Sequence, residues 1–338
     1  MRQDIAAMTP REGEIEAFLA AGEWRRAVRH PFAADASFRR YFRLSGGPKP
    51  ALLMDAPPPA EDVRPWVKIA RHLAGLGLSA PAIHQADEAR GLLVIEDFGD
   101  DTFAHLLEDG AAAEPLYAAA VDALATLHRA PAATRIDVPR YDAAEMIAKA
   151  SLLLDWFLPA IGAAATPEAR AAYRSAWEAV LPLRERVPES LALRDYFPEN
   201  LMWLPAREGV RRTGLLDFQD AMMAPCVYDL VSLVEDARRD VPAALRRAML
   251  DRYFAAFPGR DRAAFESAAA VVAAQRHARV IGVFARLWKR DGKPGYLAHI
   301  PRVWHQLERA LVHPGLAPLW RWFDRNVPAP LRRAPEAA

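Results

Sequence analysis

The sequence predicts an α+β fold of two lobes, a small β-rich lobe over residues 1–97 and a larger helical lobe over residues 98–338. Three observations support this prediction. At 338 residues the chain is long for one hydrophobic core, because single cores stop growing at about 250–300 residues. Strand-like patterns gather before Phe98, and helical periodicity dominates after it. One hairpin pattern interrupts the helical part between Leu191 and Phe218.

The first lobe combines strands and helices. Residues 37–44 alternate aromatic or aliphatic side chains with arginines, and residues 51–55 form a short apolar run. A Gly-Gly-Pro turn separates the two segments, which predicts neighbouring antiparallel strands. Residues 91–96 predict another buried strand. Apolar residues at helical spacing predict helices over residues 11–21 and over residues 62–75.

The second lobe is predicted to be mostly helical. Helical spacing covers residues 114–128, 142–157 and 167–181, and it returns after residue 218. The exception is a pair of short apolar runs, residues 201–204 and 214–216, that flank the polar segment AREGVRRT and predict a hairpin. The lobes are expected to meet near residues 97–100, because Phe98-Gly99 breaks the preceding strand.

Composition argues against several classes of protein. Lys and Arg total 44 and Asp and Glu total 43, and the resulting net charge of +1 is too small for a dedicated nucleic-acid binder. No segment offers the roughly 20 apolar residues of a membrane-spanning helix. The single cysteine, Cys226, excludes an intramolecular disulfide and fits a reducing cytoplasm. We therefore expect a cytoplasmic protein without a nucleic-acid or membrane partner, and we take it to be a monomer.

Several familiar catalytic and nucleotide-binding motifs are missing from the sequence. It contains no Walker-type phosphate loop, no nucleophile elbow and no His-Glu-x-x-His pair. Residues 75–80 match G-x-G-x-x-A by their letters, but they follow a predicted helix and precede Pro81. A dinucleotide-binding fingerprint follows a strand and opens a helix. We therefore interpret residues 75–80 as the end of a helix.

The most informative residues flank the predicted hairpin. Asp195 precedes it, Asn200 opens its first strand, and Asp217 follows its second strand. Phosphoryl transfer needs a carboxylate beside the attacking hydroxyl and oxygen ligands that hold Mg²⁺ against a triphosphate. Asp195 is therefore the candidate catalytic carboxylate, and Asn200 and Asp217 are the candidate metal ligands. Each residue alone is an ordinary turn or capping residue, but their joint spacing favours the catalytic interpretation.

At these residues the sequence resembles the aminoglycoside phosphotransferase and choline kinase superfamily, whose fold is that of protein kinases. The resemblance runs along nearly the whole chain and implies a bilobal ATP-dependent kinase. Residues 37–44 resemble the hairpin over the nucleotide phosphates, and Glu96, Asp97 and Phe98 look like the hinge that contacts adenine. Residues 193–200 resemble the catalytic loop, and residues 228–230 resemble the segment that braces that loop.

Longer strings narrow the resemblance to bacterial anomeric kinases of N-acetylmuramate and N-acetylglucosamine in peptidoglycan recycling. These strings are ASFRRYFRL, LLMDAPPPAEDVRPW, LLDFQDAMMAPCVYDLVSLVED and QRHARVIGVFARLWKRDGKPGY. The resemblance implies phosphorylation of the C1 hydroxyl of an amino sugar, with ATP and Mg²⁺ as cofactors. Two alternatives stay open: a kinase of another small alcohol, such as an aminoglycoside, choline or a different sugar, and a nucleotide-binding pseudokinase.

Two departures from the superfamily pattern affect the expected site. Leu193 stands where the catalytic loop often begins with His. Met54 or Asp55 stands where protein kinases place a Lys, and the chain has five lysines against 39 arginines. Arg39 and Arg40 are the nearest candidates to neutralise the nucleotide phosphates. The alternative for both is a solvated strand face.

The candidate sugar contacts are Asp236, Arg276, His277 and Arg279. The last three place polar groups in an otherwise apolar helical region. Asp236 follows the segment 228–232 and is a candidate for sugar hydroxyls or, alternatively, for an ion pair with Arg238 or Arg239. An Arg side chain is well suited to bind the lactyl carboxylate of N-acetylmuramate through two hydrogen bonds. The alternative interpretation of each residue is a salt-bridged helix face.

Overall fold

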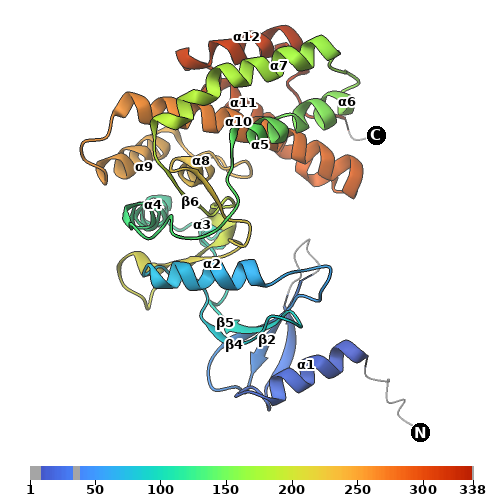
Figure 1. Cartoon of the computed structure of the whole chain (residues 1–338), viewed down its shortest axis with the longest axis vertical. Helices are drawn as coiled ribbons and strands as arrows, with labels where there is room; N and C mark the ends of the chain where they lie inside the picture. Colours follow the sequence, from blue (N-terminus) through green and yellow to red (C-terminus); the bar gives the residue numbers. More distant parts are fainter. Residues whose placement is uncertain (1–8, 33–38, 337–338) are drawn as a thin grey trace. The chain divides into compact units, whose positions relative to one another are not determined.

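The computed structural model describes residues 9–32 and 39–336 of the chain (Figure 1). These residues divide into two compact units. The first unit comprises residues up to 111 together with residues 199–220, and the second comprises residues 112–198 and 221–338. The sequence predicts one boundary after Asp97, whereas the structure groups residues 98–111 and the hairpin with the N-terminal sheet.

Strand and bridge pairing explains this grouping. Ser79 pairs with Gly214 of the hairpin, and Thr102 pairs with Met202 on its other strand. Both bridges join residues of the first unit. These pairings are far apart in the sequence, and for that reason local periodicity does not predict them.

The first unit is built on a five-stranded antiparallel sheet with the strand order β1-β2-β3-β5-β4. The predicted pairing of the two N-terminal strands is confirmed, with Tyr41 opposite Met54 and Phe42 opposite Leu53. Residues 37 and 38 of the first predicted strand lie outside the described residues. The strands are β1 Val28–Phe32, β2 Arg40–Ser45, β3 Ala51–Asp55, β4 Ile83–Asp87 and β5 Leu92–Glu96.

The sequence analysis does not predict strands β1 and β4. Strand β1, VRHPF, contains a proline and is largely exposed, and β4, IHQAD, has few apolar residues. Both are edge strands of the sheet, where exposure and proline are tolerated. Their sequences therefore lack the apolar alternation by which a half-buried strand is found.

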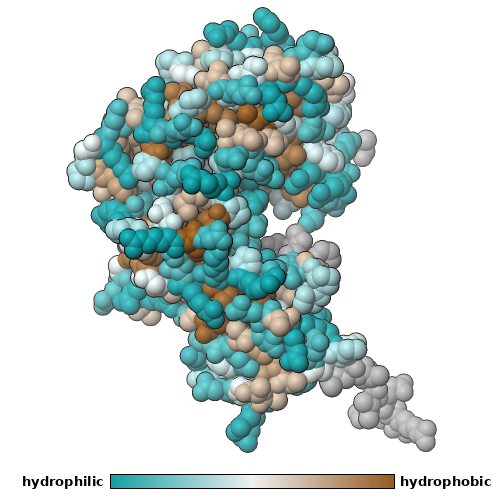
Figure 2. All heavy atoms as spheres, in the orientation of Figure 1, coloured by the Kyte–Doolittle hydropathy of each residue, from teal (hydrophilic) through white to brown (hydrophobic). Residues whose placement is uncertain are grey.

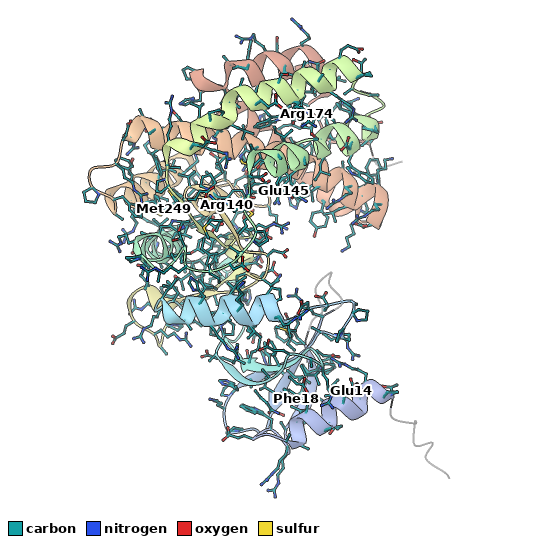
Figure 3. The ribbon with its side chains drawn as sticks, viewed as in Figure 1. Glu14, Phe18, Arg140, Glu145, Arg174 and Met249 are labelled. Carbon is teal, nitrogen blue, oxygen red and sulfur yellow. The ribbon has the colours of Figure 1, made fainter. Side chains whose placement is uncertain are left out.

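Two helices accompany this sheet, one on either side of it in Figure 1. Helix α1, Pro10–Ala20, begins at Thr9, whose side chain accepts a hydrogen bond from the Glu12 backbone N–H. Its buried residues, among them Phe18, pack in one core with Leu44, Leu53 and Val94 of the sheet. Figure 3 labels the buried Phe18 and the partly exposed Glu14 on α1. Helix α2, Arg64–Gly75, follows strand β3.

The predicted hairpin is confirmed as strands β7, Leu201–Trp203, and β8, Thr213–Leu215. Leu201 lies opposite Leu215. Gly214 is required where it stands, because a Cβ there would approach Met202 Cβ and the Phe98 ring to 2.9 Å. The first unit also contains the short helix α3, Phe103–Glu108.

The second unit is mainly helical, as predicted, with one pair of short antiparallel strands, β6 Glu189–Ala192 and β9 Met222–Pro225. Its longest helix, α10, spans Arg262–Asp291 and begins at Asp261, whose side chain accepts two backbone N–H groups. The remaining helices are α4 Ala113–Arg129, α5 Ala143–Ala150, α6 Leu158–Ala160, α7 Pro167–Val180, α8 Tyr228–Val234, α9 Ala243–Ala255, α11 Ile300–Leu311 and α12 Ala317–Asn326.

The predicted continuous helix over residues 142–157 is wrong in one respect. After α5 the backbone forms a π-helical turn over Leu153–Phe157. Helix α10 approaches this segment closely at Gly282, where a Cβ would lie 2.3 Å from the Leu152 carbonyl carbon. The irregular turn and the glycine together permit a backbone-to-backbone contact that periodicity does not reveal.

The surface is mostly polar. Figure 2 shows a face on which hydrophilic residues predominate and hydrophobic residues occupy small areas. Of the described large hydrophobic side chains, Val28, Phe32, Val312 and Trp320 are exposed. None of the helices in the described ranges combines the length and the apolar composition needed to cross a bilayer.

Candidate active site

The hairpin brings the two candidate metal ligands together within the first unit. Asn200 directly precedes β7, and Asp217 lies two residues beyond the end of β8. The Leu216 N–H donates to the Asn200 carbonyl at 3.0 Å, which extends the hairpin pairing. As a result, Asn200 Nδ2 donates to Asp217 Oδ2 at 3.4 Å, and Gln219 Nε2 donates to Asp217 Oδ1 at 2.8 Å. Carboxylate and amide oxygens are ligands that suit hard Mg²⁺.

Asp217 has a strained backbone. Its φ of +55° lies in the left-handed region, which non-glycine residues seldom occupy. Such a conformation costs of order 1–3 kcal/mol and persists where the surrounding structure imposes it, often at functional sites. The only other non-glycine residue of the described ranges with a positive φ is Arg194, at +75°. The two strained positions therefore belong to the two segments that the sequence analysis selected.

Asp229, in the first turn of α8, accepts two backbone hydrogen bonds from the candidate catalytic loop. The Leu193 N–H donates to Asp229 Oδ2 at 2.6 Å, and the Arg194 N–H donates to Asp229 Oδ1 at 2.9 Å. Burial raises the pKa of Asp229 to about 7 although these two hydrogen bonds act in the opposite direction, and the nearby charge of Asp195 raises it further. Leu193 is buried, so an apolar side chain occupies the place of the superfamily His while its N–H still binds the brace.

Asp195 follows this braced segment in the second unit. Its N–H donates to the Leu193 carbonyl at 3.0 Å, which closes a tight turn. Its side chain is 28% exposed, and the Arg194 Nε lies 3.9 Å from its Oδ2. A partly exposed carboxylate on a hydrogen-bonded turn can accept a proton from a bound hydroxyl.

A cavity of about 340 Å³ lies in the first unit, between the sheet and the hairpin. Tyr41, Leu52, Met54 and Ile95 line its sheet side. The three hinge residues also line it, and so do both candidate metal ligands. The aliphatic and aromatic walls suit a flat heterocycle, and the oxygen ligands gather at the same cavity.

The charged residues that line this cavity are all acidic. Within the described ranges no Lys or Arg lines it, and Met54, 1% exposed, faces it beside Tyr41. Arg207 donates to Glu96 at 2.5 Å, and the Arg43 Nε lies 2.6 Å from Asp97. The carboxylates in the lining are Glu96, Asp97, Asp100, Glu199 and Asp217.

The two candidate phosphate-binding arginines differ in their surroundings. The Arg40 guanidinium binds Asp55, a fully buried carboxylate that Arg11 also binds. Arg39 donates to Glu61 at 2.9 Å and also hydrogen bonds to Tyr41, which lines the cavity. Burial raises the pKa of Tyr41, Arg39 acts in the opposite direction, and the charge of Asp217 raises it further. Arg39 is therefore coupled to the cavity, whereas Arg40 serves the buried Asp55.

The four candidate sugar contacts lie in the second unit and fall into two groups. His277 is buried, and its Nε2 lies 2.6 Å from Glu235 Oε2. Burial lowers the pKa of His277 despite this partner. Arg276, also buried, donates to Ser232 Oγ at 2.7 Å. These two side chains are therefore engaged in internal contacts with α8 and the residue that follows it.

Asp236 and Arg279 retain polar atoms that the protein does not satisfy. The buried Asp236 Oδ2 and Arg279 Nε have no hydrogen-bond partner among the described residues, and neither does the Tyr228 hydroxyl. Burial works against the charge of Arg279, but Tyr228, Tyr141 and Asp195 keep its pKa above the ordinary value. These atoms can bind water or polar groups of a ligand. The sequence does not predict that the Tyr228 hydroxyl lacks a partner among the described residues, because a helical position alone predicts only core packing.

Comparison with known families supports the kinase interpretation. The profile of the family described as "Phosphotransferase enzyme family" matches residues 28–266. The chain is 38% identical to an N-acetylmuramate/N-acetylglucosamine kinase of Caulobacter vibrioides, over 96% of this chain and 98% of that protein. It is also 38% identical to a protein of the same name from Pseudomonas aeruginosa, over 90% of each chain.

Solved structures agree on the fold. A choline/ethanolamine kinase family protein from Mesorhizobium loti superposes with a TM-score of 0.60 at 16% identity, over 92% of this chain and 98% of the other. A ternary complex of streptomycin, ATP and APH(2″)-IIa superposes with a TM-score of 0.58 at 15% identity, over 93% and 98% of the two chains. At such identities the likeness establishes the fold, which is the bilobal α+β fold that the sequence predicts.

Proposed function

The chain belongs to the phosphotransferase enzyme family, and from this premise we propose that it transfers the γ-phosphoryl group of ATP to the anomeric C1 hydroxyl of N-acetylmuramate and N-acetylglucosamine. The observation that carries the phosphotransfer chemistry is the Asn200–Asp217 pair at the cavity of the first unit. The names of the relatives at 38% identity support the choice of acceptor.

Asp195 is the proposed catalytic carboxylate. It would orient the C1 hydroxyl of the sugar and take its proton as the new P–O bond forms. The Asp229 carboxylate holds the backbone of Leu193 and Arg194, so the turn that carries Asp195 is positioned without support from the substrate. Fixing a reacting group in this way lowers the entropic cost of reaching the transition state.

Asn200 and Asp217 would hold Mg²⁺ together with the phosphates. Mg²⁺ usually takes only one or two protein carboxylates and completes its coordination with phosphate and water, so this pair is sufficient. The metal supplies positive charge for the phosphoryl oxygens. Because the charged groups lining this cavity are acidic in the described residues, the metal and Arg39 are the proposed sources of that charge, and Glu96, Asp97 and Phe98 would present their backbone to adenine.

For the sugar we propose direct contacts from Asp236 and Arg279 and supporting roles for Arg276 and His277. The unsatisfied Asp236 Oδ2 suits a sugar hydroxyl, and the Arg279 guanidinium suits a carboxylate. N-acetylmuramate carries a lactyl carboxylate, whereas N-acetylglucosamine does not. Removal of the Arg279 charge would therefore raise the KM for N-acetylmuramate more than the KM for N-acetylglucosamine.

A second candidate acceptor is another small alcohol. The titles of two fold neighbours name a choline/ethanolamine kinase family protein and a streptomycin complex. Cationic acceptors such as these favour acidic sites. The two arginines of α10 near Asp195, Arg276 and Arg279, therefore favour the neutral or anionic sugar.

The test is an ATP-consumption assay over N-acetylmuramate, N-acetylglucosamine, other hexoses, choline and aminoglycosides, followed by NMR of the product. We expect turnover with the two amino sugars and coupling of ³¹P to the H1 proton. Coupling to the C6 protons, or turnover only with choline or aminoglycosides, would remove the anomeric assignment. Absence of turnover with every acceptor, together with retained ATP binding, would favour a pseudokinase.

A further inference from the structure

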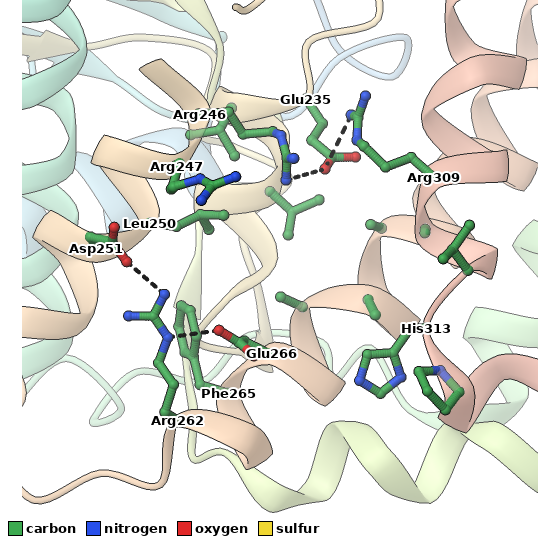
Figure 4. Close-up of a pocket in the computed structure, with 18 residues that line it drawn as sticks. Glu235, Arg246, Arg247, Leu250, Asp251, Arg262, Phe265, Glu266, Arg309 and His313 are labelled. Carbon is green, nitrogen blue, oxygen red and sulfur yellow. Dashed lines mark hydrogen bonds and ion pairs between the residues drawn. The ribbon is translucent and has the colours of Figure 1, made fainter. Parts of the chain in front are cut away.

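The second unit contains a cavity of about 650 Å³ that none of the proposed catalytic, metal or sugar residues lines (Figure 4). Its walls come from helices α8, α9, α10 and α11 and from the turn that follows α11. These segments are distant in the sequence and converge only in the folded chain. The lining of this cavity therefore differs from the residues proposed for phosphotransfer, and it calls for its own explanation.

Three arginines line this cavity, and two of them pair with the same carboxylate, Glu235. Arg246 of α9 lies 3.7 Å from Glu235 Oε1, and Arg309 of α11 lies 3.3 Å from the same oxygen. The other oxygen, Oε2, lies 2.6 Å from the His277 ring. Arg247 is the third cation, next to Arg246 in Figure 4. Charge-assisted hydrogen bonds are about 2.7–2.9 Å long, so both ion pairs to Glu235 are long.

A fourth arginine of the lining, Arg262, has carboxylate partners at ordinary hydrogen-bond distances. Arg262 donates from Nε to Glu266 at 2.7 Å and from Nη2 to Asp251 at 2.6 Å (Figure 4). By contrast, no side-chain hydrogen bond of Arg246, Arg247 or Arg309 is found within the described ranges. Their guanidinium donors are therefore available to a ligand that enters the cavity.

Charge repulsion among the three arginines also favours the binding of an anion. Burial lowers the pKa of Arg246, Glu235 acts in the opposite direction, and the charges of Arg309 and Arg247 lower it further. An anion placed among them would relieve the repulsion and accept several charge-assisted hydrogen bonds at once. Glu235 cannot do so alone, because its Oε2 is already engaged by His277.

The rest of the lining is apolar. Ala269, Ala270 and Ala273 of α10 form a wall of small side chains, and Leu250 of α9 adds to it. Val312 lines the cavity and is 78% exposed, the highest value among the described large hydrophobic side chains. An apolar group resting here would cover Val312.

We propose that this cavity binds a small organic anion, a carboxylate or a phosphate ester with an apolar body, whose charged group lies among Arg246, Arg247 and Arg309. The apolar body would rest on the alanines of α10 and on Val312. The charge pattern carries the assignment: three arginines line the space, and only Arg246 and Arg309 pair with Glu235. The fourth arginine, Arg262, is neutralised by its own two acids.

The test is isothermal titration calorimetry of the full chain with three probes: phenyl phosphate, benzoate and inorganic phosphate. We expect saturable binding of phenyl phosphate or benzoate, and the phosphate or carboxylate preference identifies the class of anion. Arg247→Gln should weaken binding about tenfold, because it removes one charge-assisted contact. Arg309→Gln provides a second variant from another helix. Arg174→Gln, on the exposed side of α7 (Figure 3), is the matched control and should bind as the unmodified chain does.

Two results would overturn the proposal. One is equal affinity of the unmodified chain and both cavity variants for phenyl phosphate and benzoate. The other is the absence of saturable binding of either aromatic probe. Equal affinity for phenyl phosphate and inorganic phosphate would overturn the assignment of the apolar body. No step of this experiment involves turnover, so its failure leaves the proposed phosphotransfer untouched, and failure of phosphotransfer leaves this cavity untouched.

Discussion

Asp217 and Asp229 are both associated with backbone of positive φ, but Asp217 adopts that conformation itself, whereas Asp229 binds the backbone of another residue that does. Asp217 itself adopts a φ of +55° and lines the cavity of the first unit, where side-chain N–H groups of Asn200 and Gln219 orient its carboxylate. Asp229 is 1% exposed in the second unit, and its carboxylate accepts the backbone N–H groups of Leu193 and Arg194, the latter at a φ of +75°.

This difference distinguishes carboxylates that are available for chemistry, here called chemical, from carboxylates that only stabilise the fold, here called structural. A carboxylate that keeps an open side can bind a metal or take a proton, whereas a buried one that accepts backbone donors determines the shape of a loop. Asp195 belongs with Asp217 in this respect, because its side chain is 28% exposed. Substitution of a chemical carboxylate should therefore affect turnover, and substitution of the structural one should affect stability and its pH dependence.

The largest effect is expected at Asp195. Asp195→Asn removes the proposed proton acceptor with almost no change in volume, so kcat should fall about 10²- to 10⁴-fold. The dissociation constants for ATP and sugar should stay near their original values. Steady-state kinetics and calorimetric ATP binding provide the measurement. Retention of full turnover would move the catalytic role to another residue, with Glu199 the first to examine.

Asp217→Asn should lower turnover at least about a hundredfold, because even outer partners of metal ligands are worth 10- to 100-fold. The free energy of unfolding should change little, since the cavity side of the carboxylate is open. Turnover titrated against Mg²⁺ measures the effect, and thermal unfolding is the control. Unmodified turnover of the variant at limiting Mg²⁺ would exclude Asp217 as the ligand.

Asp229 should appear instead in the pH dependence of stability. Its folded-state pKa of about 7 lies above the ordinary value of 3.8, so the folded chain holds this proton more tightly than the unfolded chain. The stabilisation is fully present below the unfolded-state pKa and is lost as pH rises through about 7, with a slope of at most about 1.4 kcal/mol per pH unit. Asp229→Asn should remove this slope, measured by urea unfolding across the range.

Asp229→Asn also exchanges one acceptor oxygen for an amide N–H, so a constant loss of stability is expected at every pH. The informative quantity is therefore the slope of the free energy of unfolding against pH, not its value at any one pH. If the variant and the unmodified chain lose stability in parallel between the two pKa values, the Asp229 carboxyl does not hold the raised pKa.

The smallest effect distinguishes two neighbouring arginines. Arg39→Ala should raise the KM for ATP about tenfold, the loss of one charge-assisted contact, with little change in the KM for sugar. Arg40→Ala should leave both KM values near the original and lower the free energy of unfolding by about 1 kcal/mol, because Asp55 keeps Arg11. Kinetics of the two variants side by side test this. The reverse pattern would assign the phosphate contact to Arg40.

Much of this architecture is legible in local patterns. Apolar alternation and turn residues predict the hairpin of residues 201–204 and 214–216, and strand pairing confirms it. The spacing of Asp195, Asn200 and Asp217 directs attention to the two segments that carry the positive φ values. These features depend on interactions between residues close in the sequence, where periodicity and turn chemistry are informative.

Contacts between residues distant in the sequence determine the side-chain partners and the cavity linings. Arg39 and Arg40 are adjacent and alike in the sequence, but in the fold Arg39 binds Glu61 and Arg40 binds Asp55. The sequence does not show that His277 binds Glu235, because the two residues are 42 positions apart in the chain. The arginine cavity joins four helices, α8, α9, α10 and α11, in the same way. Side chains that meet only after long-range packing leave no periodic signal, so which of them bind each other or face a ligand is a property of the folded chain.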